Sequence, residues 1–240
     1  MAAPSSITAH PATGLSNSEL LRKKIRLASC YDPASTSLLL HPRLAEFYPE
    51  VLFLLHSTAR ASVPLMQAAL ERSRELAEHD EVAAALVAYL AEHIVEEADH
   101  DEWMLQDMEL LGIKREQVLQ RIPALGVIEA VGAQYYWIHH VHPVAFLGYL
   151  EALEGEPVAV DAVEYAMQHS GLPPAAFRTL LVHAQNDPDH SADLDRLIDR
   201  LPLDAAQTAM LGVSAITITS AVESAYSAIL KPYLASTPRG

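Results

Sequence analysis

The sequence predicts an all-α fold, and three observations support this prediction. Most segments are rich in Ala, Leu and Glu, and their apolar residues recur with the helical period of about 3.6 residues. Gly and Pro are concentrated at the breaks between these segments. The one strand-like run, "ITIT" at 216–219, lies within the long Ala- and Ser-rich segment "GVSAITITSAVESAYSAIL", which favours a buried helix.

The expected helices follow one another with short connections. Asp80 is suited to the N-cap of the third helix and Gly112 to its C-terminal end, and Pro173 and Pro174 suit the first turn of the sixth. The seven helices are expected at about 18–30, 43–78 (interrupted near Pro49 and Pro64), 80–111, 124–154, 157–169, 173–200 and 204–233.

A single domain is expected, because neither an internal repeat nor a low-complexity linker divides the chain. We expect residues 1–17 to form a flexible tail and residues 18–236 to form one helical domain. At 240 residues, of which 50% are hydrophobic, such a domain is large enough to enclose an internal site.

Charge and cysteine content exclude several classes of function. The formal net charge of -15 argues against nucleic acid or an anionic membrane as a partner. The single cysteine, Cys30, cannot form a disulfide within the chain and is expected to be inert packing. The N-terminus lacks the features of a secretory signal, and no run reaches the roughly 18 uninterrupted apolar residues of a membrane span. We therefore expect a soluble, cytoplasmic protein.

Two stretches carry a His, carboxylate, His pattern with the spacing i, i+4, i+7. "HIVEEADHDEW" provides His93, Glu97 and His100, which on one helix lie within roughly 60° of one another. "HAQNDPDH" repeats the spacing with His183, Asp187 and His190. The two patterns together predict two ligand-bearing helix faces.

A divalent metal explains these patterns best. Buried carboxylates and imidazoles are costly to desolvate, and one metal ion can satisfy several of them. Carboxylate and imidazole ligands without thiolates suit iron or manganese, and less selectively zinc. A third segment, "FLGYLEALEG", supplies Glu151 and Glu154 on a largely apolar stretch, and either could bridge two metals.

Simpler interpretations apply to the same residues. A single histidine in a helix is more often a surface or satisfied core residue than a ligand, and "EEADHDE" could be a solvated acidic face. Pro188 raises a separate question, because Asp187-Pro188 could start a new helix and separate His183 from His190. Alternatively, Pro188 kinks a continuing helix and frees the carbonyl of Ala184. The sequence leaves these two alternatives open.

Three stretches resemble the heme-oxygenase-like diiron oxidases and oxygenases, whose relatives include metal-free thiaminase-like and quinone-cofactor-synthase-like proteins. The stretches are "HIVEEADHDEWMLQDMELLG", "HPVAFLGYLEALEG" and "HAQNDPDH" followed by "SADLDRLIDRL", and the resemblance covers roughly residues 40–235. It implies a heme-oxygenase-like seven-helix bundle, often dimeric, that binds two Fe(II) ions and uses O2 as co-substrate.

The resemblance also implies a ligand set. Glu97 and His100 match the Glu-x2-His motif, and His183, Asp187 and His190 match His-x3-Asp-x2-His. No catalytic residue apart from the metal ligands is assigned.

Two further positions follow from the resemblance. The middle ligand is Glu154 or Glu151, with Glu154 preferred because it adjoins the "EG" break. His93 lies where some members place another ligand and others a residue that supports the ligands. Some members add a carboxylate from the preceding core helix, whereas this chain has only His56 there before Glu71. The second iron is therefore expected either to be weakly held or to bind only when substrate or O2 is present.

The expected activity is O2-dependent oxidation of a small organic substrate, such as an amino acid, a fatty acid or another small carboxylate, in specialised metabolism. Hydroxylation, desaturation, oxidative decarboxylation or C–C cleavage and N-oxygenation all fit. Arg60 is a candidate anchor for a substrate carboxylate. The expected partners are this substrate, an electron donor and a second copy of the chain, without nucleic acid or membrane.

Two other function classes fit the same residues. A metal-free, thiaminase-like enzyme of the same fold would use His183 and Glu97 in acid–base chemistry. A non-catalytic iron- or heme-binding helical protein is the other class. A ferritin-like site would show two Glu-x-x-His motifs, whereas this sequence has one, and its counterpart is the Asp-x-x-His of residues 187–190.

Overall fold

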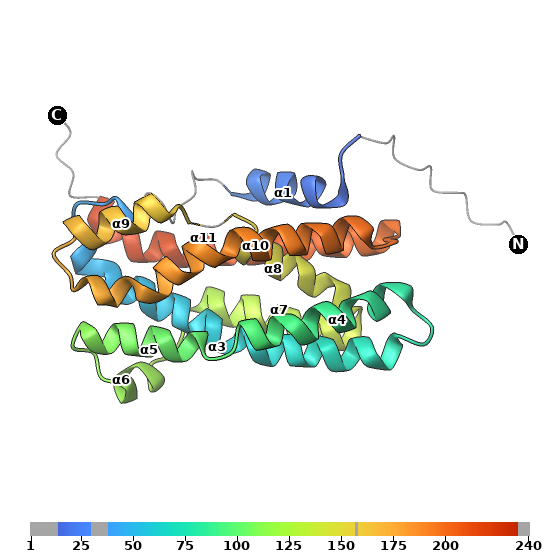
Figure 1. Cartoon of the computed structure of the whole chain (residues 1–240), viewed down its shortest axis with the longest axis horizontal. Coiled ribbons are helices and arrows are strands. Elements are labelled where there is room, and N and C mark those ends of the chain that lie inside the picture. Colours follow the sequence, from blue (N-terminus) through green and yellow to red (C-terminus); the bar gives the residue numbers. More distant parts are fainter. Residues whose placement is uncertain (1–13, 30–37, 157, 235–240) are drawn as a thin grey trace, which may run out of the picture.

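The computed structural model describes residues 14–29, 38–156 and 158–234, and of Asp187 and Leu234 only the backbone. Within these ranges the chain is helical and contains no strand, which confirms the predicted all-α class (Figure 1). The elements are α1 (Asn17–Ala28), α3 (Leu44–Leu76), α4 (Glu81–Glu96), α5 (His100–Leu110), α6 (Arg115–Leu119), α7 (Leu125–His140), the 3-10 turn η1 (Pro143–Ala145), α8 (Phe146–Glu154), α9 (Val160–His169), η2 (Pro174–Phe177), α10 (Arg178–Arg200) and α11 (Ala205–Leu234).

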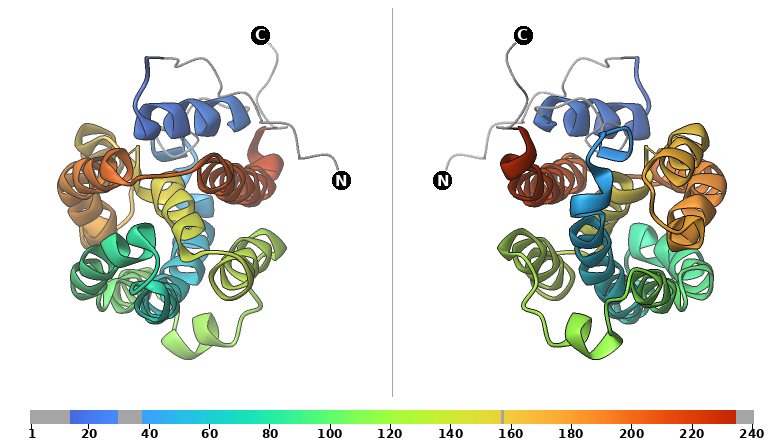
Figure 2. Two further views of the ribbon diagram at one scale, coloured as in Figure 1. Left: turned by 90° about the vertical axis from the view of Figure 1, so that its right-hand side faces the viewer. Right: turned by 90° about the vertical axis from the view of Figure 1, so that its left-hand side faces the viewer.

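The helices form a bundle around α3 and α8. Seen along the long axis, α4 and α10 lie on one side, α7 and α11 lie on the other, and α3 and α8 lie between them (Figure 2). The helix α1 lies across one outer face of the bundle, where it packs on α8, α10 and α11. This arrangement brings α4, α8 and α10, which carry most of the candidate ligands, next to one another.

Several predicted helices begin or end elsewhere in the structure. The predicted interruptions near Pro49 and Pro64 do not occur, because α3 continues through both prolines. The predicted helix 124–154 is divided at His142-Pro143, where the residue before proline is extended, as its steric clash with the proline ring requires. The short helix α6 was not predicted. "ITIT" lies within α11, as predicted.

The predicted helix ends at Asp80 and Gly112 are confirmed. The Asp80 side chain accepts a hydrogen bond from the backbone N–H of Ala83 at 2.8 Å and so caps α4. Gly112 has φ +79°, the left-handed conformation in which glycine ends helices without strain.

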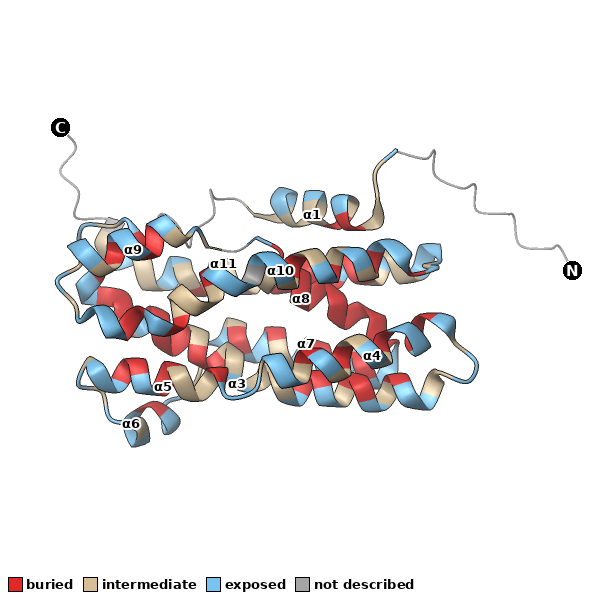
Figure 3. Ribbon diagram, viewed as in Figure 1, coloured by how far each residue is buried: buried red, intermediate tan, exposed pale blue. Residues whose placement is uncertain are grey.

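The core of the described chain contains a small apolar cluster of Leu54, Val127 and Ala225 and two large clusters. One cluster includes Leu86, Leu90 and Leu194, and the other includes Leu105 and Ala184. Figure 3 shows that α8, in the middle of the bundle, is largely buried.

The helix α11 is unusually apolar for its exposure. Its segment Ala205–Tyr233 is the one described helix long and apolar enough to cross a membrane, and 39% of its most apolar window is buried inside the bundle. Between Asp204 and Lys231 it has a single charged residue, Glu223. The antiparallel helix α7 packs closely on it, because Gly126 lets the two backbones approach at Ala221.

Candidate metal centre

A break in the chain after α4 determines where the first histidine motif lies. The helix ends at Glu96, Asp99 adopts a left-handed conformation with φ 67°, and α5 begins at His100. The predicted continuous helix 80–111 is therefore wrong, and His93, Glu97 and His100 do not form one stripe. The left-handed conformation of Asp99 interrupts the helix, and aspartate is one of the few residues that tolerate it.

The break distributes the motif between two groups of potential metal ligands. The first group, which we call site 1, consists of Glu97, His100 and His183. The second group, site 2, consists of His93, Glu154 and His190. Within each site, one ligand atom from each residue lies within 4.8 Å of the other two. Two three-ligand sites are thus assembled from α4, α5, α8, α10 and the connection after α4.

The side chains of site 1 are oriented by contacts between residues that are close in sequence. Glu97 Oε2 lies 2.9 Å from His100 Nδ1, three residues along the chain. The ring of His183 places Nδ1 2.8 Å from the backbone carbonyl of Thr179, which makes Nδ1–H the donor and leaves Nε2 as the free donor atom for a metal. The two imidazole rings meet edge to face, with centroids 4.7 Å apart.

Site 2 draws one ligand from each of three helices. His93 Nε2 on α4 lies 3.1 Å from Glu154 Oε2 on α8, and the His93 ring lies 5.4 Å from that of His190 on α10. The other ring nitrogen of His93 lies 3.2 Å from Glu96 Oε2. Tyr89 stacks on the ring of His93, with the two ring centroids 5.3 Å apart.

Glu97 lies between the two sites. While its Oε2 faces His100, its Oε1 lies 3.9 Å from His190 Nδ1 in site 2. One carboxylate therefore presents an oxygen to each group and could contribute a ligand atom to both sites.

The electrostatics of the two sites differ. Burial alone would lower the pKa of His93, but the hydrogen bond and charge of Glu154 and the charge of Glu97 raise it to about 9. In site 1, burial lowers the pKa of His183, and the charge of His100 lowers it further. Burial also opposes ionisation of Glu97, but His100 and the neighbouring imidazoles hold its pKa below the ordinary value. Site 1 thus favours a neutral imidazole beside an ionised carboxylate, as a metal requires.

The donor set fits a pair of metal ions. The six side chains provide four imidazoles and two carboxylates without a thiolate, which suits iron, manganese or zinc. His190 Nδ1 is buried and has no hydrogen-bond partner among the described atoms. Buried polar atoms are normally satisfied, so an ion is a natural partner for this imidazole.

Of the two glutamates proposed on α8, the structure brings Glu154 to the sites and Glu151 to a different partner. Glu151 is fully buried and its Oε1 accepts a hydrogen bond from Arg22 Nε at 2.7 Å. Burial raises the pKa of Glu151 to about 7, although Arg22 opposes this effect. Glu151 and Glu154 are one turn apart on a short helix, so the sequence could not separate their partners.

The remaining predicted residues are placed as follows. The helix α10 is continuous through Pro188, so His183 and His190 lie on one helix, as in the alternative in which the helix continues. The side chain of Asp187 lies outside the described residues, as does Cys30. Arg60 is exposed on α3, outside both sites. His56 is buried on α3 with neither ring nitrogen bonded to a described atom, and it belongs to neither site.

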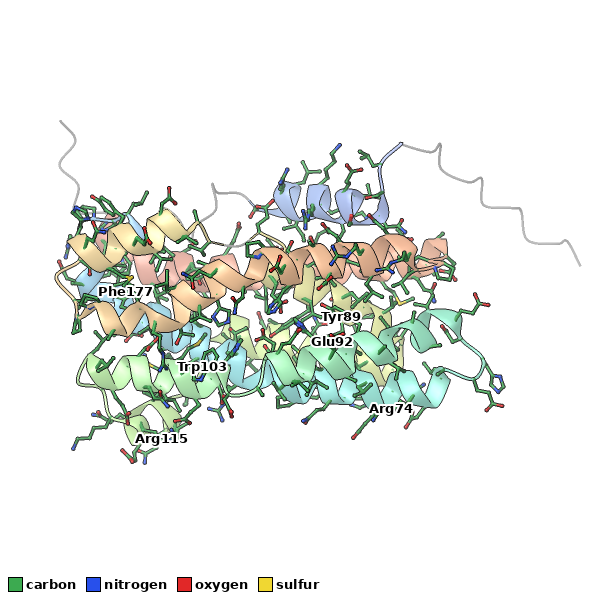
Figure 4. All side chains as sticks on the ribbon, in the orientation of Figure 1. Arg74, Tyr89, Glu92, Trp103, Arg115 and Phe177 are labelled. Carbon is green, nitrogen blue, oxygen red and sulfur yellow. The ribbon has the colours of Figure 1, made fainter. Side chains whose placement is uncertain are left out.

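A cleft of about 510 Å³ between α4 and α10 leads to site 2. Figure 4 labels Tyr89 and Glu92 on the side of α4 that faces α10. The lining residues are Ala85, Ala88, Tyr89, Glu92, His93, Glu96, His190, Asp193, Leu197, Arg200 and Leu201. This cleft gives a small molecule direct access to His93 and His190, and Arg200 rather than Arg60 is the arginine that lines it.

Sequence reasoning missed three contacts of the candidate ligands and of Glu151. Tyr89 lies four residues before His93, a spacing that places both on one helix face and that could have identified it. Thr179 lies four residues before His183 and supplies its backbone carbonyl, which no side-chain pattern reveals. Arg22 lies 129 residues from Glu151, and its contact depends on the tertiary fold alone.

The chain resembles known proteins in sequence and in fold. A family described as iron-containing redox enzyme matches residues 55–218. No curated protein matches the chain significantly. A domain of unknown function with a heme oxygenase-like fold from Shewanella denitrificans OS217 superposes with a TM-score of 0.71 at 14% identity, covering 95% of each chain.

Two other solved structures share the fold. A TenA homologue from Pseudomonas syringae pv. tomato DC3000 has a TM-score of 0.68 at 11% identity, covering 93% of this chain and 98% of its own. A CADD-like protein of unknown function from Nostoc punctiforme PCC 73102 has a TM-score of 0.65 at 13% identity, covering 90% and 97%. The fold is thus heme oxygenase-like, as the sequence resemblance implied, and the chain belongs to the family of iron-containing redox enzymes.

Proposed function

We propose that this protein is a non-heme diiron oxidase or oxygenase that uses O2 to oxidise a small organic substrate. The observation that carries the proposal is the pair of three-ligand sites with Glu97 between them. Two Fe(II) ions bound there would supply the electrons that reduce O2. The protein side chains would position the substrate, hold or transfer protons, and exclude water.

The side chains of site 1 keep their ligand atoms oriented before a metal arrives. The Thr179 carbonyl fixes the tautomer of His183, and the Glu97 carboxylate fixes the ring of His100. In site 2, His93 must lose its proton to bind a metal, and Glu96 and Glu154 are adjacent to accept hydrogen bonds or protons from it. Such preorganisation reduces the cost of assembling the centre.

The cleft between α4 and α10 is the proposed substrate site. Its arginine, Arg200, can pair with a substrate carboxylate, and Glu92 and Asp193 can pair with an amino group. We infer that a small carboxylic acid, with amino acids favoured over fatty acids by this mixed lining, is oxidised at the end of the cleft near His93 and His190. Hydroxylation, desaturation, oxidative C–C cleavage and N-oxygenation are all compatible with this site, and a reaction that consumes electrons requires an external donor.

A metal-free acid–base enzyme is a second candidate function, because a TenA homologue shares the fold and His183 and Glu97 lie in the same buried site. The experiment that separates the two is O2 consumption. Anaerobically prepared protein, with and without added Fe(II), is mixed with a library of amino acids and fatty acids in oxygenated buffer. Iron-dependent O2 uptake that requires one substrate class supports the oxidase. Substrate turnover without iron supports the acid–base enzyme, and iron uptake without substrate-dependent O2 consumption supports an iron-binding protein.

We also propose a cytoplasmic homodimer that associates through α7 and α11. The exposed side chains of this face include Ile128, Tyr136, Val213 and Ile216, and Glu129 is its main charge. Each copy has a formal net charge of -15, so two copies repel one another over most of their surfaces and can meet at this charge-poor face.

A further inference from the structure

The helix α1 is fastened to the bundle by polar contacts as well as by apolar packing. Leu21 belongs to the apolar core, and Ser18 donates hydrogen bonds from its backbone N–H and its hydroxyl to the carboxylate of Asp199 at 2.8 Å and 3.0 Å. These contacts hold one face of α1 against α10. Arg22, one turn further along α1, therefore reaches into the bundle from a fixed position.

The guanidinium of Arg22 joins two of the helices that carry site 2. Its Nε donates to Glu151 Oε1 on α8 at 2.7 Å. Its Nη2 donates to Ser191 Oγ on α10 at 2.7 Å and lies 2.7 Å from Asp195 Oδ2 on the same helix. Charge-assisted contacts from one planar guanidinium fix direction as well as distance.

The residues that Arg22 contacts adjoin the ligands of site 2. Glu151 precedes Glu154 by three residues on α8, and Ser191 directly follows His190 on α10. Ser191 Oγ in turn donates to the backbone carbonyl of Gly155, the residue after Glu154, at 3.2 Å. Arg22, Glu151, the end of α8 and Ser191 thus form a closed loop of contacts around the two ligand positions.

Site 1 does not depend on this loop. The orientations of Glu97 and His100 are set by their own turn, and that of His183 by the carbonyl of Thr179 in α10. In site 2, Glu154 and His190 come from different helices, so their separation depends on how α8 and α10 are held together. A displacement of about 1 Å is enough to weaken a metal site or a catalytic site considerably.

We propose that Arg22 is a positioning residue that holds Glu154 and His190 at metal-binding distance, so that loss of Arg22 removes the metal of site 2 and leaves the metal of site 1. This inference rests on the proposed function to the extent that both sites bind metal. It assigns the N-terminal helix to the metal centre, although α1 contributes no ligand. It also gives Glu151 a role, as the acceptor that anchors Arg22 instead of a ligand.

The test measures Co(II) binding to the metal-free full-length chain under anaerobic conditions, with stoichiometry from calorimetry and ligand geometry from the visible spectrum of cobalt. The variants are Arg22→Met, Arg22→Lys and Arg26→Met. Arg26 is the matched control, because it lies on the same helix and pairs with Glu156 at 2.6 Å while being 66% exposed.

Wild-type protein and Arg26→Met are expected to bind two Co(II) ions per chain. Arg22→Met is expected to retain one and to bind the second at least tenfold more weakly, with Arg22→Lys intermediate. Adding Glu154→Gln to Arg22→Met is expected to have no further effect on the remaining site, whereas adding His183→Ala should abolish it.

A further variant distinguishes the loss of the site 2 metal from a general loss of structure. Because Arg22→Met leaves Glu151 buried without its cation, the double variant Arg22→Met/Glu151→Gln removes both partners and is expected to keep the circular dichroism of the wild type. It is still expected to lose the site 2 metal. Two cobalt ions bound with wild-type affinity in this folded variant would overturn the inference, as would equal weakening of both sites. If wild-type protein binds no metal, the proposed function fails as well.

Discussion

The carboxylate of Glu97 faces two imidazoles at once, with Oε2 2.9 Å from His100 Nδ1 and Oε1 3.9 Å from His190 Nδ1. These imidazoles belong to different three-ligand sites, so Glu97 is the side chain that couples them. We therefore expect Glu97→Gln to weaken the binding of each of the two metals by about tenfold or more, because an amide supplies only one neutral oxygen. Titration of the metal-free variant with Co(II) measures this directly. Loss of one metal with the other unaffected would show that Glu97 serves a single site.

The two glutamates of α8 are expected to behave differently when each is replaced by glutamine. Glu154→Gln should reduce metal binding from two ions per chain to one, since Glu154 contributes one of the three ligands of site 2. Glu151→Gln keeps the hydrogen bond acceptor for Arg22 and removes a buried charge, so it should retain at least most of the binding of both ions. Metal analysis after gel filtration distinguishes the two variants. The reverse result would identify Glu151 as the ligand.

The left-handed conformation of Asp99 is expected to limit what this position accepts. Its φ of 67° is easily adopted by glycine and disfavoured for β-branched residues. Asp99→Gly should therefore leave the free energy of unfolding within about 0.5 kcal/mol of the wild type, whereas Asp99→Val should lower it by about 1–2 kcal/mol. Urea unfolding of the metal-free protein measures both. Equal stabilities of the two variants would mean that the break between α4 and α5 is not conformationally demanding.

The stability of the metal-free protein should fall as the pH rises above neutrality. His93 has a pKa of about 9 in the folded chain, mainly because Glu154 and Glu97 oppose the effect of burial, against an ordinary value near 6.5. Its contribution is therefore fully present below about pH 6.5 and is lost as the pH rises through about 9, with a size on the order of 3 kcal/mol. Urea unfolding at pH 6 and pH 9.5 should show this loss in wild-type protein and a much smaller one in His93→Gln. A wild-type free energy of unfolding that is constant over this range would contradict it.

The charge-poor face of α7 and α11 should be sensitive to a single added charge. Ile128 is 50% exposed on α7, and Ile128→Lys is expected to convert a dimer to a monomer because it would place a cation in an apolar contact. Leu27→Lys on α1 is the control, because Leu27 is 85% exposed on another face. Sedimentation velocity at several protein concentrations gives the oligomeric state. A wild-type monomer at every concentration would exclude association through this face.

The helical class and most of the helix positions could be predicted because the apolar period extends over long segments. The break at residues 97–99 could not be predicted from the sequence, because apolar helical segments lie on both sides of it. Only the left-handed conformation of Asp99 in the structure reveals it. This break changes which residues share a metal site. The sequence suggested that His93, Glu97 and His100 act together on one face, whereas the fold assigns His93 to a different site from His100.

The partners of the individual ligands depend on contacts that are distant in sequence. His93, Glu154 and His190 converge because α4, α8 and α10 pack together, and no local spacing encodes that arrangement. The choice between Glu154 and Glu151 depends on Arg22, which is supplied by a helix that the motif analysis did not include. The continuity of α10 through Pro188 was one of two locally acceptable conformations, and the packing of the bundle selects it.

The central claim is that the chain holds two iron ions, one in each three-ligand site. Anaerobic titration of the metal-free protein with ⁵⁷Fe(II), followed by iron analysis and Mössbauer spectroscopy, tests it most directly. Two ferrous ions per chain in the wild type and one in Glu154→Gln are the predicted results. Failure of the wild-type protein to retain iron at any loading would contradict the claim.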